Sequence, residues 1–325
     1  MNQCDRDKSN IFYILRGFAI WSVVYAHSLN LQNHYLSVLG SLIGLIGVPL
    51  FLICSGYYFK NQPWPEFWRK KFKSLLCPWI IWGTCAYAVS CFLGASELSM
   101  IRYISYLLGY NTWLYYVPVY FSILLVYNTV KVKFMDFGLI IISMLSIVLT
   151  YVFHLQILAG FMTFYQNPLN FIFFFSIGRI LKENDVLEQI QGGGGILFMA
   201  SIVVIFSILY FFLTDNIVRY VNPFALLFQL SFVVILFRVV AIIKGSKVMA
   251  YLGKNSFIIY FLHMQIGIAL TNKILILLNV ANEYILFALK PILVIIITVA
   301  IVQLLNIFIR YLNMANYRQI FGLVR

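Results

Sequence analysis

Long apolar stretches recur along this chain from one end to the other, and short polar segments separate them. A helix crosses a hydrocarbon layer of ~30 Å with about 20 residues, because it rises ~1.5 Å per residue. Apolar runs of about 18 or more residues therefore predict membrane-spanning helices. The pattern predicts ten spans, at residues 11–30, 38–59, 74–93, 111–130, 136–153, 165–182, 195–213, 223–243, 255–278 and 285–309.

The composition agrees with a membrane protein. Of the 325 residues, 62% are hydrophobic and 10% are charged, and the mean hydropathy is +0.92. These values are far from those of an average soluble domain. We therefore expect one all-α domain over residues 1–325, folded as a polytopic membrane helix bundle of about ten transmembrane helices. Residues 100–109 are compatible with a separate interfacial helix before Trp113, and the longest polar stretches, 60–73 and 182–195, are expected to be loops.

The basic residues predict the orientation of the bundle. If the N-terminus lies inside and ten spans alternate, nineteen Lys and Arg residues fall on the cytoplasmic side and four on the outer side. Cytoplasmic loops carry an excess of basic residues, so we expect both termini to be cytoplasmic in a multi-pass protein of the cell (inner) membrane. The net charge of +13 is then a consequence of topology and not of nucleic-acid binding, since the basic residues are scattered over short loops.

Several features that resemble functional motifs have simpler interpretations. Val24-Tyr25-Ala26 loosely fits a signal-peptide cleavage site, but Arg16 lies inside the apolar segment, so we expect a retained span. The run Gly192–Gly195 lacks the strand and the lysine of a phosphate-binding loop and is expected to be a flexible linker. His34 and His154 fall in predicted outer loops, where solvated histidines are usual. The five cysteines show neither metal-ligand spacing nor a disulfide framework.

Arg16 and His27 lie in the first apolar segment, with ten residues between them. Eleven helical positions make almost three whole turns, so both side chains project from nearly the same face, ~16 Å apart along the axis. Ionisable groups inside a span need a cavity or a partner, which makes them functional candidates. The alternative is that Arg16 reaches the cytoplasmic headgroups and His27 marks the opposite interface.

The polar chemistry inside the predicted spans comes from histidine, arginine, serine and tyrosine. All ten acidic residues fall in loops or at span ends, whereas ion-coupled transporters typically place carboxylates at mid-membrane. No two histidines have metal-ligand spacing, so we expect no metal site. A neutral imidazole in a dry cavity suits general-base chemistry, which makes His27, with Arg16, a candidate catalytic residue.

Five patterns follow one another along the chain: Arg16 with His27, Gly47–Tyr57, Arg69–Pro78, Thr112–Tyr116, and Gly253–His263. The first is an Arg-x10-His spacing, the second reads GVPLFLICSGY, and the last contains Gly-x-x-Ser followed by Tyr and His. Together they resemble, in sequence and in order, the motifs of the membrane-bound acyltransferase family 3. The chain departs from that family's pattern in two places. Its basic stretch is rich in lysine where arginine is common, and a leucine at position 52 replaces a usual aromatic residue.

The resemblance implies an integral membrane O-acyltransferase with ten helices. Such an enzyme takes an acyl group, usually acetyl, from cytoplasmic acetyl-CoA as a donor substrate, without a permanently bound cofactor. It passes the group to a hydroxyl of a cell-surface polysaccharide or a lipid-linked saccharide. The expected partners are therefore acetyl-CoA, a glycan acceptor and membrane lipids.

The same patterns supply candidates for binding the two substrates. Arginine and lysine at the cytoplasmic side are suited to the phosphates of the donor. The candidate donor-binding residues are Arg69, Lys70, Lys73 and Ser55. The candidate acceptor-binding residues are Trp113, Tyr116, Tyr260 and His263.

Each of these residues also has a structural interpretation. The basic stretch is equally expected from topology alone, and Ser55-Gly56 is typical of a small-residue contact between helices. Trp113 and Tyr116 fit an interfacial aromatic belt, and His263 fits a buried structural histidine.

The reaction and the function class also have alternatives. His27 either deprotonates the acceptor hydroxyl or carries the acyl group itself. A transporter of polysaccharide or lipid, or an enzyme of the same fold that uses another donor such as succinyl-CoA, are the competing interpretations.

Overall fold

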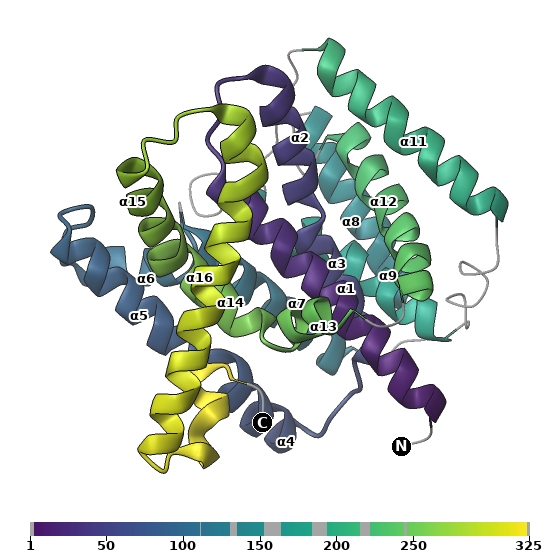
Figure 1. Cartoon of the computed structure of the whole chain (residues 1–325). Coiled ribbons are helices and arrows are strands. Elements are labelled where there is room, and N and C mark those ends of the chain that lie inside the picture. Colours follow the sequence, from purple (N-terminus) through teal and green to yellow (C-terminus); the bar gives the residue numbers. More distant parts are fainter. Residues whose placement is uncertain are drawn as a thin grey trace.

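The computed structural model describes residues 3–110, 112–130, 135–152, 164–183, 194–214, 222–243 and 246–323, and Figure 1 shows their arrangement. Within these ranges the chain forms helices and no strand, which confirms the all-α class. The α-helices in chain order are α1 (Gln3–Ser28), α2 (His34–Leu45), α3 (Gly47–Tyr58), α4 (Trp64–Lys71), α5 (Cys77–Phe92), α6 (Met100–Leu107), α7 (Tyr116–Thr129), α8 (Met135–Val152), α9 (Ile172–Glu183), α11 (Gly194–Leu213), α12 (Pro223–Ile243), α13 (Lys247–Lys254), α14 (Ser256–Leu262), α15 (Ala269–Leu277) and α16 (Glu283–Tyr311).

Short turns of other helix types connect several of these helices. Two are π-helical, η1 (Phe72–Leu76) between α4 and α5 and η5 (His263–Ile268) between α14 and α15. Four are 3₁₀ turns: η2 (Trp113–Tyr115), η3 (Phe164–Gln166), η4 (Pro168–Asn170) and η6 (Ala315–Phe321). Because α4, η1 and α5 are continuous, they make one long helical segment, and so do α14, η5 and α15.

Helix α1 is the centre of the bundle. It packs against α2, α3, α12, α13, α14 and α16, and Figure 1 shows it passing through the middle of the molecule. Its inward positions are apolar and fully buried, as at Leu15, Ile20 and Val24. Between helices in a membrane such side chains stabilise the fold by close van der Waals packing, because the surrounding lipid tails are as apolar as they are. The apolar face of the first predicted span therefore holds the surrounding helices together.

Glycines allow two helix crossings that are closer than side chains would permit. A Cβ atom on Gly17 of α1 would lie 2.1 Å from the backbone oxygen of Met249, and one on Gly253 of α13 would lie 1.8 Å from that of Tyr13. In the same way, a Cβ on Gly56 of α3 would meet the backbone of α9 at 2.1 Å. Close approach of this kind is the usual role of small residues between membrane helices. The prediction of a helix contact at Ser55-Gly56 is therefore confirmed for Gly56.

Eight helical segments of the described chain are long and apolar enough to cross a membrane, judged by their length and composition. They correspond to eight of the ten predicted spans. The other two predicted spans, 111–130 and 165–182, contain the shorter helices α7 and α9. Residues 100–107 form the separate helix α6, as the sequence indicated.

Two predicted boundaries are wrong. The helix expected from residue 165 begins at Ile172, because the Asn167 side chain accepts a hydrogen bond from the backbone N–H of Leu169 and Pro168 starts a short turn. The loop expected over 60–73 becomes helix α4 at Trp64, since a proline near its start and a buried Phe67 favour a half-buried helix. The prediction for His154 falls outside the described residues, as do Gly192 and Gly193. Gly194 and Gly195 begin helix α11, so the expected linker is wrong for these two residues.

The start of α1 and the C-terminal segment η6 lie at the same end of the bundle (Figure 1). Two chain ends at the same end of the bundle are expected when the chain crosses the membrane an even number of times. That this end faces the cytoplasm stays a prediction.

Candidate functional site

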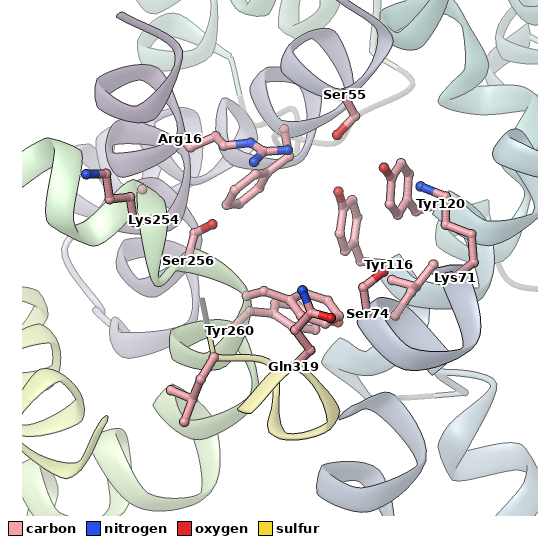
Figure 2. Close-up of a pocket in the computed structure, with 16 residues that line it drawn as sticks. Arg16, Ser55, Lys71, Ser74, Tyr116, Tyr120, Lys254, Ser256, Tyr260 and Gln319 are labelled. Carbon is pink, nitrogen blue, oxygen red and sulfur yellow. The ribbon is translucent and has the colours of Figure 1, made fainter. Parts of the chain in front are cut away.

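A cavity of about 420 Å³ opens among helices from both ends of the sequence. Arg16 enters it from α1, Ser55 from α3, Tyr116 from α7, Tyr260 from α14 and Gln319 from η6. Figure 2 shows the side chains of Arg16, Ser55, Tyr116 and Gln319 directed toward the same open space. The full lining is Arg16, Phe51, Ser55, Lys71, Ser74, Leu75, Tyr116, Tyr120, Gly253, Lys254, Ser256, Phe257, Tyr260, Gln319, Gly322 and Leu323.

Two cationic groups face this cavity. The Arg16 guanidinium points into it from α1, and Lys71, the last residue of α4, lies on the other side beside Tyr120 (Figure 2). Lys254 also belongs to the lining, but its ammonium lies over the ring of Tyr13, 5.2 Å from the centroid, and points away from the cavity. In the described part of the chain no carboxylate lies within ion-pair distance of Arg16. The cavity is therefore positively charged and suited to an anionic ligand.

Aromatic rings form one wall of the cavity. The rings of Tyr116 and Tyr120 are one helical turn apart on α7 and stack with an interplanar angle of 3° and a centroid distance of 5.7 Å. Tyr260 meets Tyr116 edge to face at 5.7 Å. Ring faces of this kind stack on flat ligand groups, and the tyrosine and serine hydroxyls offer hydrogen bonds. The wall suits a ligand that carries both a flat ring and polar groups.

Tyr260 connects the cavity to a pair of histidines. Its hydroxyl donates a hydrogen bond to the backbone oxygen of Trp113, and its own backbone oxygen lies 2.7 Å from Nδ1 of His263. The rings of His263 and His27 lie next to each other, with a centroid distance of 5.4 Å. The predicted candidates Trp113, Tyr260, His263 and His27 thus form one connected cluster behind the cavity.

The tautomer of His263 follows from its contact with Tyr260. A carbonyl oxygen only accepts hydrogen bonds, so Nδ1 of a neutral His263 carries the proton and Nε2 has a free lone pair. His263 is fully buried, and Nε2 has no hydrogen-bond partner in the described structure. Nε1 of Trp113 is also buried without a partner. A donor on Trp113 and an acceptor on His263 are thus both unsatisfied in the described structure, and buried polar groups of this kind are usually paired with a partner or a ligand.

His27 lies in the last turn of α1, and its side chain is accessible. It does not line the cavity that contains Arg16, which agrees with the ~16 Å expected between the two residues on one helix. The two polar residues of α1 therefore mark two places, a cationic cavity at Arg16 and an accessible imidazole at His27.

The residues of the basic stretch fall into two groups, one exposed and one that lines the cavity. Arg69, Lys70 and Lys73 are exposed and do not belong to the lining, and Lys70 forms an exposed ion pair with Glu66 at 2.5 Å. Lys71 and Ser74 line the cavity instead. Ser55, the neighbour of the helix-contact residue Gly56, is buried and lines the cavity as well.

Several lining residues were not among the sequence candidates. Lys71 and Ser74 have a helical spacing of three residues with the apolar Leu75 and Pro78 beside them, and this pattern indicates which side of the basic stretch faces inward. Gln319 has no such pattern in the sequence around it. In the described part of the chain, no three His, Cys, Asp or Glu side chains lie together as metal ligands would.

Comparison with known proteins identifies the family. A family model for an acyltransferase domain, that of acyltransferase family 3, matches residues 12–307, which include most of α1 and most of α16. Searches of curated proteins and of solved structures found no match to the chain. The matched region contains Arg16, His27, Ser55, Tyr116, Tyr260 and His263. The chain therefore belongs to the membrane-bound acyltransferase family 3.

Proposed function

We propose that this acyltransferase moves an acetyl group from acetyl-CoA to a hydroxyl of a cell-surface polysaccharide or a lipid-linked saccharide, in the cell (inner) membrane. The observation that carries the proposal is the arrangement of two neighbouring sites. A cationic cavity contains Arg16, and a histidine pair lies directly behind its Tyr260 wall. A long thioester donor with charged phosphates at one end has the chemistry that these two sites together suit.

The donor end of the proposal rests on the cavity. Arg16 and Lys71 are suited to the phosphates of coenzyme A, because arginine and lysine are the usual phosphate-binding residues. The stacked Tyr116 and Tyr120 rings are suited to the adenine or to the pantetheine arm. A cavity of about 420 Å³ is in the range of small-molecule sites. The exposed Arg69, Lys70 and Lys73 then contribute long-range attraction and topology, not direct contacts.

The transfer step is assigned to His27. The acceptor hydroxyl oxygen attacks the thioester carbonyl, a C–O bond forms, and the C–S bond breaks. The proton of the hydroxyl passes to the imidazole and then to the departing thiolate, which leaves as coenzyme A. In the second route His27 takes the acyl group first and the hydroxyl attacks the acyl-imidazole, with the same overall balance.

His263 is a positioning residue in this scheme. Because its Nδ1 is held by the Tyr260 backbone oxygen, its Nε2 lone pair is available to accept a hydrogen bond from His27. Such a bond fixes which nitrogen of His27 faces the acceptor hydroxyl. Trp113 Nε1, which has no hydrogen-bond partner among the described residues, is suited to a sugar hydroxyl.

The experiment that tests the activity is acyl transfer by the purified protein. We expect turnover of acetyl-CoA, and a slower reaction with succinyl-CoA supplied at the same concentration. Mass spectrometry of surface glycans from cells with and without the gene should show the loss of an acetyl group. A faster reaction with succinyl-CoA would mean that the donor is succinyl-CoA, and the assignment as an acyltransferase would stand. If there is no acyl-CoA turnover and the gene is instead needed for glycan export, the transporter interpretation holds.

The proposed orientation has its own test. A reporter that is active only outside the cell should be silent when fused after Arg325 and active when inserted near Glu97. Activity of the fusion after Arg325 would contradict the cytoplasmic placement of the C-terminus.

A further inference from the structure

The last described segment of the chain folds back onto the bundle. After α16 ends at Tyr311, η6 runs from Ala315 to Phe321 and lies against η1, α5 and α16. Figure 1 shows this yellow segment beside the lower end of α16. The family match ends at residue 307, so the segment lies outside the region that defines the family.

Specific contacts hold this segment in place. Arg318 Nη2 donates a hydrogen bond of 2.6 Å to Oδ1 of Asn306 on α16, and Trp82 Nε1 donates one of 3.0 Å to the backbone oxygen of Phe321. Gly322 then turns the chain with a positive φ of 78°, which favours glycine, and Leu323 is 2% exposed. The segment is therefore a fixed wall of the molecule, held at its middle by Arg318 and at its C-terminal end by Phe321 and Leu323.

That wall belongs to the cavity of Arg16. Gln319, Gly322 and Leu323 all line it, and Figure 2 shows Gln319 on the side opposite Arg16 and Ser55. Gln319 is the one side chain amide in the lining. In the described part of the chain, this amide has no hydrogen-bond partner, although its backbone is held on both sides. A partly buried amide with free hydrogen-bonding groups is available to a ligand.

An amide recognises a different part of a ligand than the cations do. Phosphate oxygens only accept hydrogen bonds and are best met by Arg16 and Lys71. A secondary amide of a ligand offers one N–H donor and one C=O acceptor. The carboxamide of glutamine has an oxygen that accepts from the N–H and an NH₂ group that donates to the C=O. The pantetheine arm of an acyl-CoA contains such amides between the phosphates and the thioester.

We propose that Gln319 is a donor-binding residue that hydrogen-bonds an amide of the pantetheine arm, and that the segment Ala315–Leu323 thereby fixes how deeply the thioester enters the bundle. This inference rests on the proposed acyl-CoA site. It adds to that site a contact from outside the family-matched region.

The test compares Gln319→Ala with Gln303→Ala in the purified full chain. Gln303 is an exposed glutamine on α16 that does not line the cavity, so the same substitution there is the matched control. We expect Gln319→Ala to raise the KM for acetyl-CoA about 3- to 10-fold, the range for one lost neutral hydrogen bond, with kcat within about 2-fold. Gln319→Glu should raise KM further, because a carboxylate cannot donate a hydrogen bond and repels the phosphates. Gln303→Ala should match the wild type.

A truncated donor identifies the part that Gln319 contacts. With S-acetylpantetheine, which lacks the phosphates and the adenine, the Gln319→Ala effect should persist, whereas the Lys71→Ala effect should disappear. A Gln319→Ala effect that disappears with this donor would overturn the assignment to the pantetheine amides.

Equilibrium binding of coenzyme A separates this inference from the proposed function. If Lys71→Ala weakens binding and Gln319→Ala does not, the donor site stands and the contact of Gln319 is refuted. If the wild-type chain binds no coenzyme A, the proposed donor site fails and the inference fails with it.

Discussion

Arg16 and Arg179 both lie on helices of the bundle, but the structure engages their guanidinium groups in opposite ways. Arg179 on α9 donates from Nε to both oxygens of Asp136, at 3.1 and 3.2 Å, and from Nη2 to Glu183 at 2.9 Å. It also lies over the ring of Tyr127, 5.2 Å from the centroid. Arg16 faces a cavity and has no such carboxylate among the described residues.

The surroundings of Arg179 form a closed network. The Tyr127 hydroxyl donates to Asp136 at 2.8 Å and lies 2.6 Å from the Ser176 hydroxyl, so three helices, α7, α8 and α9, share one buried cluster. Every group in it has a partner inside the protein. Such a cluster fixes the geometry of helices and has nothing left to offer a ligand.

The difference between the two arginines indicates a structural role for Arg179 and a ligand-binding role for Arg16. Arg179 stabilises a junction of short helices, and its loss would leave a buried carboxylate unpaired. Among the described residues Arg16 has no hydrogen-bond or ion-pair partner, so its donors are available to a ligand and its loss would leave no described group unpaired. We therefore expect substitutions around Arg179 to lower stability, and substitutions around Arg16 and His27 to lower activity in a folded protein.

The largest expected effect on activity is at His27. His27→Ala should lower the rate of acyl transfer by roughly 10²- to 10⁴-fold, the usual contribution of a group that transfers a proton. Coenzyme A binding should stay near the wild-type value, because His27 does not line the cavity of Arg16. His27→Gln should be nearly as inactive, since an amide does not titrate near neutrality. Steady-state kinetics and ligand binding on the same preparation measure both quantities, and near wild-type transfer by folded His27→Ala would refute the catalytic role.

The next largest effect concerns stability at Asp136. Asp136→Ala removes the carboxylate partner of Arg179 and a hydrogen-bond acceptor of Tyr127. Breaking a buried pair from one side typically destabilises a protein by about 3–5 kcal/mol, so thermal unfolding in detergent should begin at a clearly lower temperature. Glu183→Gln is the control, because Glu183 is 56% exposed and an exposed pair contributes about 1 kcal/mol or less. Equal unfolding temperatures for Asp136→Ala and the wild type would show that the network is not structural.

Arg16 should show an intermediate effect on binding. Arg16→Ala should raise the KM for acetyl-CoA by about 10- to 100-fold, as expected for the loss of charged hydrogen bonds of roughly 1.5–3 kcal/mol. Arg16→Lys keeps the charge but not the planar pair of donors, so it should be less impaired. The unfolding temperature of both variants should stay near that of the wild type. A large drop in that temperature would make Arg16 a second structural arginine and remove the contrast with Arg179.

The smallest effect separates two neighbouring lysines. Lys71→Ala should weaken coenzyme A binding by a few fold, and added salt should reduce this difference, because the contact is partly Coulombic. Lys73→Ala should have little effect, since Lys73 is exposed and outside the lining. Titration calorimetry at low and high salt measures both variants. A larger effect of Lys73 than of Lys71 would mean that the donor binds outside this cavity.

Much of the fold could be predicted from the sequence because long apolar helices are set by length and hydropathy. Where length and hydropathy gave only a weak signal, local hydrogen bonds and side-chain packing determined where a helix begins. The turn at Asn167-Pro168 delays α9, and the buried Phe67 turns an expected loop into a helix. Neither feature changes the average hydropathy of its segment, so a reading of apolar runs does not detect them.

The candidate site was predictable where a residue belongs to a pattern. Arg16, Ser55, Tyr116 and Tyr260 come from segments that resemble family motifs, and all four line the cavity. The choice of Lys71 over its basic neighbours depends on the phase of a helix that was not expected. Gln319 reaches the cavity because the chain folds back after α16 and brings it close to residues far away in the sequence. A local sequence pattern does not predict such a long-range contact.

The π-helical turns η1 and η5 have a consequence for changes of chain length. A π turn accommodates one residue more than an α-helix over the same rise, so each turn acts as a one-residue insertion. Removing one residue from Phe72–Leu76 or from His263–Ile268 should therefore leave the flanking helices intact and convert the turn to regular α-helix. His263 is the first residue of the second turn, so a deletion within Met264–Ile268 should keep its ring beside His27, whereas deletion of His263 itself removes the ring. The position of a single-residue deletion in this turn would then decide whether the chemistry is lost.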